Sequence, residues 1–143
     1  MKIVKCNPYS DIDVVIANNM ITNGSFPNLI ILDVRTQSEY DERHLENSIL
    51  IPVTELDTRI EELSQYKDAE ILVYCRTGVR SVQASNILDS HDFNKVFNML
   101  GGINAWESAG YLIIPEFSSW IMIPLFFSIT LSAIILRKRT ETK

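Results

Sequence analysis

The sequence predicts an α/β domain whose mainly parallel sheet is covered by helices on both faces, followed by a C-terminal transmembrane helix. Short apolar runs alternate along the chain with amphipathic segments, which is the order of elements in parallel sheets. Uncharged residues fill positions 117–136, whereas most of the acidic side chains come earlier. A length of 143 residues leaves room for one domain of ordinary size beside such a segment.

The first predicted elements are a helix and a buried strand. Ser10, with Asp13 three residues later, is typical of a capping box that opens an amphipathic helix, and Gly24 is placed to end it. The apolar run Leu29–Leu32 contains two isoleucines and is bounded by turn residues, which favours a buried strand. Asp33 would then lie at the carboxyl edge of that strand.

The middle of the chain repeats this order. Thr36 and Glu39 form a second capping pattern, which predicts a short helix. The segment Ser48–Ile51 predicts a strand that stops at a proline. Thr54 and Asp57 favour a further helix, which would place three apolar side chains in the core: Leu56, Ile60 and Leu63.

The last third of the domain contains two more strands. Ile71–Tyr74 predicts a buried strand, and the segment from about Ser81 to Leu88 predicts a helix with apolar residues at core spacing. Lys95–Met99 predicts one more short strand. The glycine pair at 101–102 then predicts a turn, which a brief helix around residues 105–106 follows.

Composition excludes several classes of function. A net charge of −5 disfavours nucleic-acid binding, because the only dense basic cluster is Arg137–Arg139. The two cysteines, Cys6 and Cys75, cannot form a disulfide framework, and the histidines His44 and His91 are not at metal-ligand spacing. We therefore expect neither a metal nor a cofactor.

Cys75 occupies the position at which open parallel sheets bind ligands. It follows the buried strand Ile71–Tyr74 and precedes a helix, so the intervening loop should turn several backbone amides inward around an anion. Together with the charges of Arg76 and Arg80, this environment should lower the pKa of the thiol. The alternative is that Cys75 is a small buried hydrophobic residue, as most free cysteines are.

Four segments resemble rhodanese-like domains. Cys75–Ser81 looks like the active-site loop of that family, and Leu32–Arg35 followed by Glu39 and Tyr40 resembles a motif after its second strand. His44–Pro52 resembles the histidine-containing turn and the next strand of the family. Leu100–Gly102, together with Trp106, resembles its C-terminal glycine pair and tryptophan. The resemblance covers roughly residues 9–112.

Two local departures concern loop shape. The family commonly has glycine where this chain has Arg43, and a Pro-Gly-Ala turn where it has Glu46–Ser48. They concern the shape of these loops and not the chemistry. The resemblance therefore still implies the fold and chemistry of a rhodanese-like parallel sheet.

The resemblance implies sulfur transfer by covalent catalysis. Cys75 would take sulfane sulfur from a small anionic donor such as thiosulfate, hold it as a persulfide, and pass it to a thiol or another nucleophilic acceptor. Arg76 would face the entrance and attract the donor, while Arg80 would brace the loop. The terminal sulfur would lie among the backbone amides of the residues implied to bind substrate: Arg76, Thr77, Gly78, Val79 and Arg80.

Three further residues are implied to support the loop. These are Asp33, Arg35 and Ser81. Asp33 could accept hydrogen bonds that hold the loop, but an ordinary role as a turn residue at a strand end is equally compatible with its position.

Two rival functions remain open. The active-site loop of cysteine phosphatases has a cysteine and an arginine separated by five residues. Here four residues separate Cys75 from Arg80, and Ser81 stands where a phosphatase would have its arginine. The planar arginine fork that would clamp phosphate oxygens is thus out of register. The second rival is a non-enzymatic, membrane-tethered sulfur carrier or sensor, which the intact cysteine allows.

The C-terminal part of the chain has the features of a membrane span. The uncharged stretch Phe117–Leu136 contains twenty residues, enough for a helix to cross a hydrocarbon core of roughly 30 Å. Trp120 is an interface anchor at one boundary, and Arg137–Arg139 is a positive flank at the other. We predict a domain over residues 1–114 and a membrane tail over 115–143; the alternative is a buried core helix.

The tail also resembles a sorting signal. Pro115, Glu116 and Phe117, then the apolar stretch and the basic cluster, are similar to the PEF-CTERM tail of archaeal surface proteins. This resemblance implies an archaeal source, processing by a sortase-like enzyme, and a domain outside the cell with its basic end in the cytoplasm. The N-terminus shows no secretory signal, which leaves a cytoplasm-facing domain as the alternative.

Overall fold

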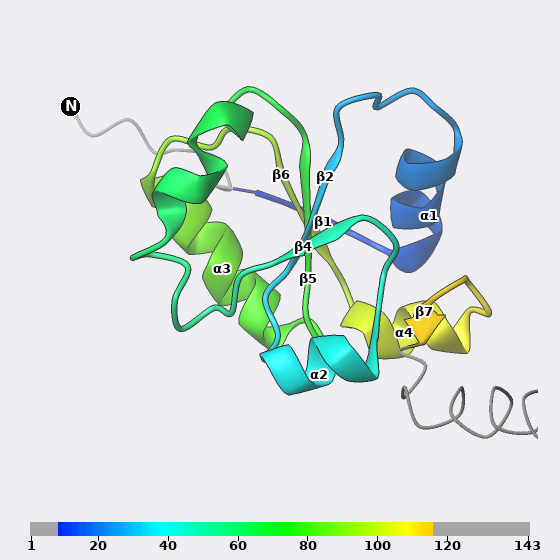
Figure 1. The fold of residues 1–143 in the computed structure, drawn as a ribbon. Helices are drawn as coiled ribbons and strands as arrows, with labels where there is room; N and C mark the ends of the chain where they lie inside the picture. The colour runs from blue at the N-terminus through cyan, green and yellow to red at the C-terminus, as the bar shows by residue number, and fades with distance from the viewer. Residues whose placement is uncertain (1–8, 116–143) are drawn as a thin grey trace, which may run out of the picture.

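The computed structural model describes residues 9–115. The main feature of this part of the chain is a five-stranded parallel sheet. Figure 1 shows this sheet running through the middle of the domain, with strand order β1-β6-β5-β2-β4. All four pairings within it are parallel. Its strands are β1 (Ser10–Ile12), β2 (Ile30–Asp33), β4 (Ser48–Leu50), β5 (Ile71–Tyr74) and β6 (Val96–Met99).

Helices cover both faces of the sheet, so the predicted fold class is confirmed for the described part of the chain. In Figure 1, α3 and the 3-10 helix η1 lie on one side, α1 and α4 lie on the other, and α2 lies at the carboxyl ends of the strands. The helices are α1 (Val14–Thr22), α2 (Gln37–Glu42), η1 (Ile60–Tyr66), α3 (Val79–Ser90) and α4 (Gly102–Ser108).

The central strand β5 is buried on both faces. The side chains of Ile71 and Val73 pack into the cluster that includes residues of α3 and η1, whereas those of Leu72 and Tyr74 pack into the cluster that includes residues of α1 and α4. This alternation follows from the two-residue period of a strand. Tyr74 is paired with Asp33 of β2, so the carboxyl ends of these neighbouring strands are level and Cys75 emerges at that edge.

The prediction that Ser10 opens a helix is wrong. Ser10 belongs to β1, which pairs with β6 at the edge of the sheet. The helix cap is Asp13, whose side chain accepts a hydrogen bond from the amide of Ile16 at 2.8 Å. Three residues are too few to show strand alternation, so the local capping pattern gave the wrong start.

The prediction of a helix that begins at Thr54 is also wrong. Residues 53–59 form turns, and the next regular element is η1, a 3-10 helix. The amide of Glu55 bonds the Pro52 carbonyl at 2.8 Å, a three-residue turn that tightens the chain before a helix can begin. The apolar residues expected in the core are nevertheless buried: Leu56, Ile60 and Leu63.

A small second sheet was not predicted. It consists of two antiparallel strands, β3 (Arg43–His44) and β7 (Ile114–Pro115). Because β3 contacts α2, this pairing places the end of the described chain near that helix. Strands of two residues carry no readable periodicity.

The predicted membrane segment 117–136 and the tail from residue 116 lie outside the described residues. Within residues 9–115, no helix is long and apolar enough to cross a membrane.

Candidate active site

Cys75 is the first residue of the loop that joins β5 to α3. The residue is buried, with 1% of its surface exposed, and it forms no disulfide. The amide of Gly78 donates a hydrogen bond to its sulfur at 3.1 Å. Gly78 has a φ of 100°, a left-handed conformation that favours glycine and turns this amide inward at the start of α3. The sulfur is therefore held by at least one backbone donor of the loop.

Hydrogen bonds decide the ionisation of this thiol. Burial alone would raise the pKa of Cys75, because the thiolate loses its hydration. Hydrogen bonds from the hydroxyl and amide of Ser81, and from the amides of Thr77 and Gly78, outweigh that penalty and leave the pKa below its ordinary value. Cys75 therefore ionises more readily than an ordinary cysteine, although its side chain is buried.

The Ser81 hydroxyl has two acceptors within reach but only one proton. It lies 3.0 Å from the carbonyl oxygen of Gly78, and it also lowers the pKa of Cys75. An ionised acceptor forms the stronger hydrogen bond, so we assign the proton to the sulfur when Cys75 is a thiolate. Ser81 is fully buried, and its place in the first turn of α3 directs the hydroxyl toward the loop.

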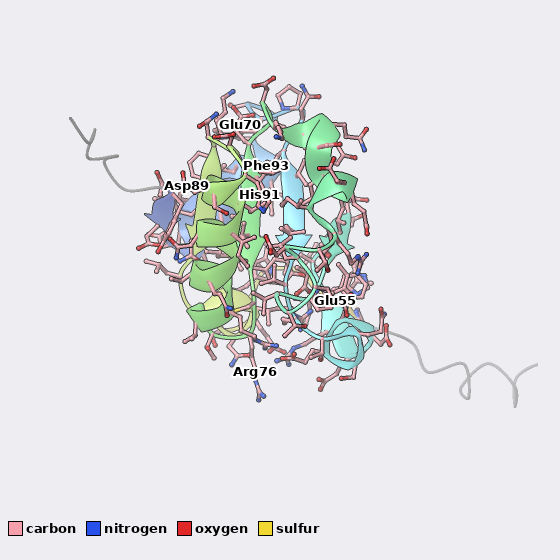
Figure 2. The ribbon with its side chains drawn as sticks, turned by 90° about the vertical axis from the view of Figure 1, so that its left-hand side faces the viewer. Glu55, Glu70, Arg76, Asp89, His91 and Phe93 are labelled. Atoms are coloured by element: carbon pink, nitrogen blue, oxygen red, sulfur yellow. The ribbon has the colours of Figure 1, made fainter. Side chains whose placement is uncertain are left out.

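The two arginines of the loop occupy different environments. Arg80 forms two hydrogen bonds of 2.7 Å with the carboxylate oxygens of Glu39, and this pair is partly buried. Arg76 is exposed, and Figure 2 shows its side chain projecting away from the body of the domain. Hydrogen bonds are the leading causes that lower the pKa of Cys75, and Arg80 also lies close enough for its charge to interact with Cys75.

Asp33 binds Arg35 rather than the loop itself. Its buried carboxylate accepts hydrogen bonds from Nε of Arg35 at 2.9 and 3.0 Å and from Nη2 at 2.6 Å. The remaining donors of the guanidinium reach the carbonyl oxygens of Glu39 and Arg43 at 3.0 and 2.6 Å. The expectation that Asp33 accepts hydrogen bonds from the loop is thus corrected, because its carboxylate is engaged by a nearer cation.

This buried pair supports the loop indirectly. Arg35 fixes the backbone of α2, and Glu39 of α2 holds Arg80. The sequence indicates Glu39 as a capping residue and as part of a family motif, and it does complete the capping box of Thr36. Its second role was not readable, because the partner is 41 residues away.

The first turn of α4 meets the loop from the other side. The amide of Ile103 donates to the carbonyl oxygen of Cys75 at 2.9 Å, and the amide of Asn104 donates to that of Arg76 at 3.2 Å. Sequence reasoning matched the preceding glycine pair to a family motif but assigned it no contact with the loop.

The remaining loop residues are open to solvent. Thr77 is exposed, and so is Val79, with 75% of its surface accessible. Among residues 9–115, no three side chains of His, Cys, Asp or Glu gather closely enough to hold a metal ion. In the part of the chain that the structure describes, the chemistry available at this loop is that of a stabilised thiolate beneath amide donors.

Comparison with known proteins places this loop in a family context. The model of the rhodanese-like domain matches residues 16–109. A sulfurtransferase from Allochromatium vinosum is 33% identical over 89 residues, which cover 62% of this chain and 81% of that protein. The solution structure of a rhodanese-like domain from an Anabaena protein aligns with a TM-score of 0.68 and 30% identity, covering 80% of this chain and 83% of that one.

A longer relative contains a similar region. A probable molybdopterin-synthase adenylyltransferase from Porphyra purpurea is 34% identical over 101 residues. These cover 71% of this chain but 26% of the relative, so the chain spans about a quarter of that protein.

Proposed function

The chain belongs to the rhodanese-like family, and from that membership we propose that it is a sulfurtransferase working through a persulfide on Cys75. The family and the similarity to a protein named sulfurtransferase support a role in sulfur transfer. The observation that carries the specific proposal is the thiolate site: a buried sulfur with a lowered pKa that accepts hydrogen bonds from the loop.

The proposed reaction consists of two displacements at sulfur. The Cys75 thiolate attacks the outer sulfur of thiosulfate, a new S–S bond forms, and sulfite leaves with the electron pair of the bond that breaks. An acceptor nucleophile, such as a thiolate or cyanide, then attacks the terminal sulfur and releases the Cys75 thiolate. No electrons or atoms are needed from outside these reactants.

The backbone amides of the loop are suited to stabilise the negative charge that sulfur carries through this cycle. The negative charge lies first on Sγ and then on the terminal sulfur of the persulfide, one bond further out. Backbone amides that point to a common centre can stabilise either position without moving. The exposed Arg76 supplies a positive charge where an anionic donor would approach.

The geometry favours this proposal over a phosphatase. Phosphate binding would need a planar arginine fork directed at the substrate. Arg80 instead directs its fork at Glu39. A non-enzymatic carrier or sensor remains the second candidate, and the observation that favours it is the burial of Cys75, with 1% of its surface exposed, which restricts access to the sulfur.

We also propose that residues 117–136 anchor the domain in a membrane as a single-pass segment, with the domain outside and the basic C-terminus in the cytoplasm. Support comes from the twenty uncharged residues followed by Arg137–Arg139. The resemblance to PEF-CTERM tails adds an archaeal source and a sortase-like processing enzyme to this proposal. A cytoplasm-facing domain is the alternative.

Turnover tests the proposed function. The full-length chain, purified in mild detergent, should convert thiosulfate and cyanide into sulfite and thiocyanate, and Cys75→Ser should lose this activity. Initial rates at varied concentrations of both substrates should give the parallel double-reciprocal lines of a two-step displacement. Formation of a protein persulfide without turnover would favour the carrier or sensor.

A further inference from the structure

The entry to α4 is built around contacts with the backbone of the cysteine loop. Ile103 and Asn104 use their amides to bind the carbonyl oxygens of Cys75 and Arg76, at 2.9 and 3.2 Å. These amides belong to the first turn of a helix, where backbone N–H groups have no partner within the helix. The loop carbonyls are the partners that they find.

The planarity of the peptide bond links these contacts to the sulfur. In a trans peptide the C=O and the following N–H point in opposite directions. When the carbonyl of Arg76 points to α4, the amide of Thr77 must point away from α4. The Thr77 amide is one of the groups that lower the pKa of Cys75, and the amide of Gly78, the next along the loop, lies 3.1 Å from the sulfur.

Only glycine allows α4 to approach this closely. A Cβ atom on Gly102 would lie 2.3 Å from the carbonyl oxygen of Cys75 and 2.7 Å from the carbonyl carbon and oxygen of Arg76. All three are backbone atoms, so no side chain could move aside to relieve the clash. On the loop side, a Cβ on Gly78 would lie 3.3 Å from the amide nitrogen of Gly101.

We propose that Gly102 is a positioning residue for the reaction, because it lets the first turn of α4 hold the Thr77 amide toward the sulfur of Cys75. Gly102 touches no reacting atom and acts through the loop backbone. The effect on turnover rests on the proposed function, whereas the effect on thiol ionisation does not. The two can therefore be tested separately.

The experiment compares two glycine substitutions in the full-length chain, each in a Cys6→Ser background so that Cys75 is the only thiol. Gly102→Ala introduces the clash. Gly110→Ala is the matched control, because Gly110 also has a positive φ, 78° against 58°, but an added Cβ there would meet nothing within 4 Å. The rate of alkylation by iodoacetamide is measured against pH, together with the thermal unfolding midpoint.

We expect the pH at which the alkylation rate is half-maximal, the alkylation midpoint, to rise in Gly102→Ala and to stay at the wild-type value in Gly110→Ala. Sulfurtransferase turnover should fall by roughly ten- to a hundredfold in Gly102→Ala alone, as for a small displacement of a catalytic group. A folded Gly102→Ala protein with an unchanged midpoint would overturn the proposal. Absence of turnover in the wild type would defeat the proposed function but leave the alkylation comparison decisive.

A second measurement covers the case in which Gly102→Ala does not fold. In the Cys6→Ser protein, the NMR resonance of the Thr77 amide should shift as Cys75 ionises, with the same midpoint as alkylation. The amide of Ala84, buried within α3 and away from the loop, is the control. A Thr77 resonance that moves no more than that of Ala84 would show that this amide does not hold the sulfur.

Discussion

The hydroxyl of Ser81 is the side-chain donor on which the ionisation of Cys75 depends most. Its hydrogen bond lowers the pKa of the thiol, together with the loop amides. We predict that Ser81→Ala raises this pKa, so that less thiolate is present near neutral pH and alkylation slows there. At a pH above both pKa values the rates of variant and wild type should converge. The measurement is the rate of iodoacetamide reaction across the pH range in the Cys6→Ser background.

Ser85 provides a matched control on the same helix. It is fully buried, and within residues 9–115 its hydroxyl has no hydrogen-bond partner. Ser85→Ala removes the same atom one turn further along α3 and should leave the alkylation midpoint unchanged. Equal shifts in both variants would mean that loss of a buried hydroxyl loosens the helix, and the role given to Ser81 would be wrong.

Arg76 should govern the affinity for an anionic donor. The side chain is exposed beside the loop, whereas Arg80 is occupied by Glu39. We predict that Arg76→Gln raises the KM for thiosulfate several-fold with a smaller change in kcat, and that added salt reduces the difference by screening the charge. Lys67→Gln, which removes an exposed cation elsewhere, is the control. An equal effect of both substitutions would indicate net charge rather than a local site.

The site could be predicted at the level of residue types but not of partners. Cys75 at the end of a buried strand, glycine in the loop and a following helix are all readable along the chain. The pairing of Arg80 with Glu39 is not, because the two lie in different helices and meet only when α2 and α3 are placed by the sheet. A direct hydrogen bond from the loop to Asp33 was one of two roles left open by the sequence, and it does not form because Arg35, only two residues away, takes up the carboxylate.

At the scale of elements, one ion pair joins α2 to the start of α3. Arg80 holds the pKa of Glu39 down at about 2, against an ordinary value of 4.5. A carboxylate with a depressed pKa stabilises the fold fully above its ordinary pKa, and this contribution is lost as the pH falls toward the depressed value. The pair should therefore stabilise the domain at neutral pH and progressively less below about pH 4.5.

We predict that Glu39→Gln lowers the free energy of unfolding by about 1 kcal/mol at pH 7. Glutamine can still complete the capping box with Thr36, so the substitution isolates the charge. The difference from wild type, measured by urea unfolding, should shrink between pH 5 and pH 3. Glu42→Gln, at an exposed position of the same helix, is the control. A difference that does not vary with pH would contradict the role of the pair.

Element predictions succeeded where a local motif and the tertiary environment agreed. The capping box of Thr36 and Glu39 formed as expected, and the ion pair with Arg80 leaves the carboxylate able to accept the hydrogen bond from the Thr36 amide. The pattern at Ser10 failed, because pairing with β6 took that segment into the sheet. The pattern at Thr54 failed because a turn over Pro52 and Glu55 preceded it. The first error came from pairing with a distant strand, and the second from a tight turn that competes with a helix at the same place.

At the scale of the whole molecule, a folded domain precedes a sequence that we expect to enter a membrane. We predict that the full-length chain stays with membranes after alkaline carbonate extraction. Phe127→Arg combined with Ile129→Arg should release it, because two charges near the middle of the segment oppose insertion. Phe127→Leu with Ile129→Leu keeps the stretch apolar and should behave as wild type. Release of the unaltered chain would contradict the membrane proposal.

Mass spectrometry of the donor-treated protein shows whether Cys75 carries the transferred sulfur. The full-length chain is incubated with thiosulfate or polysulfide, and the peptide containing Cys75 is compared with the same peptide from Cys75→Ser. The persulfide mechanism predicts the added mass of one sulfur atom on Cys75, absent from the serine variant and removed by cyanide. An unmodified Cys75 after treatment with both donors would contradict the persulfide mechanism.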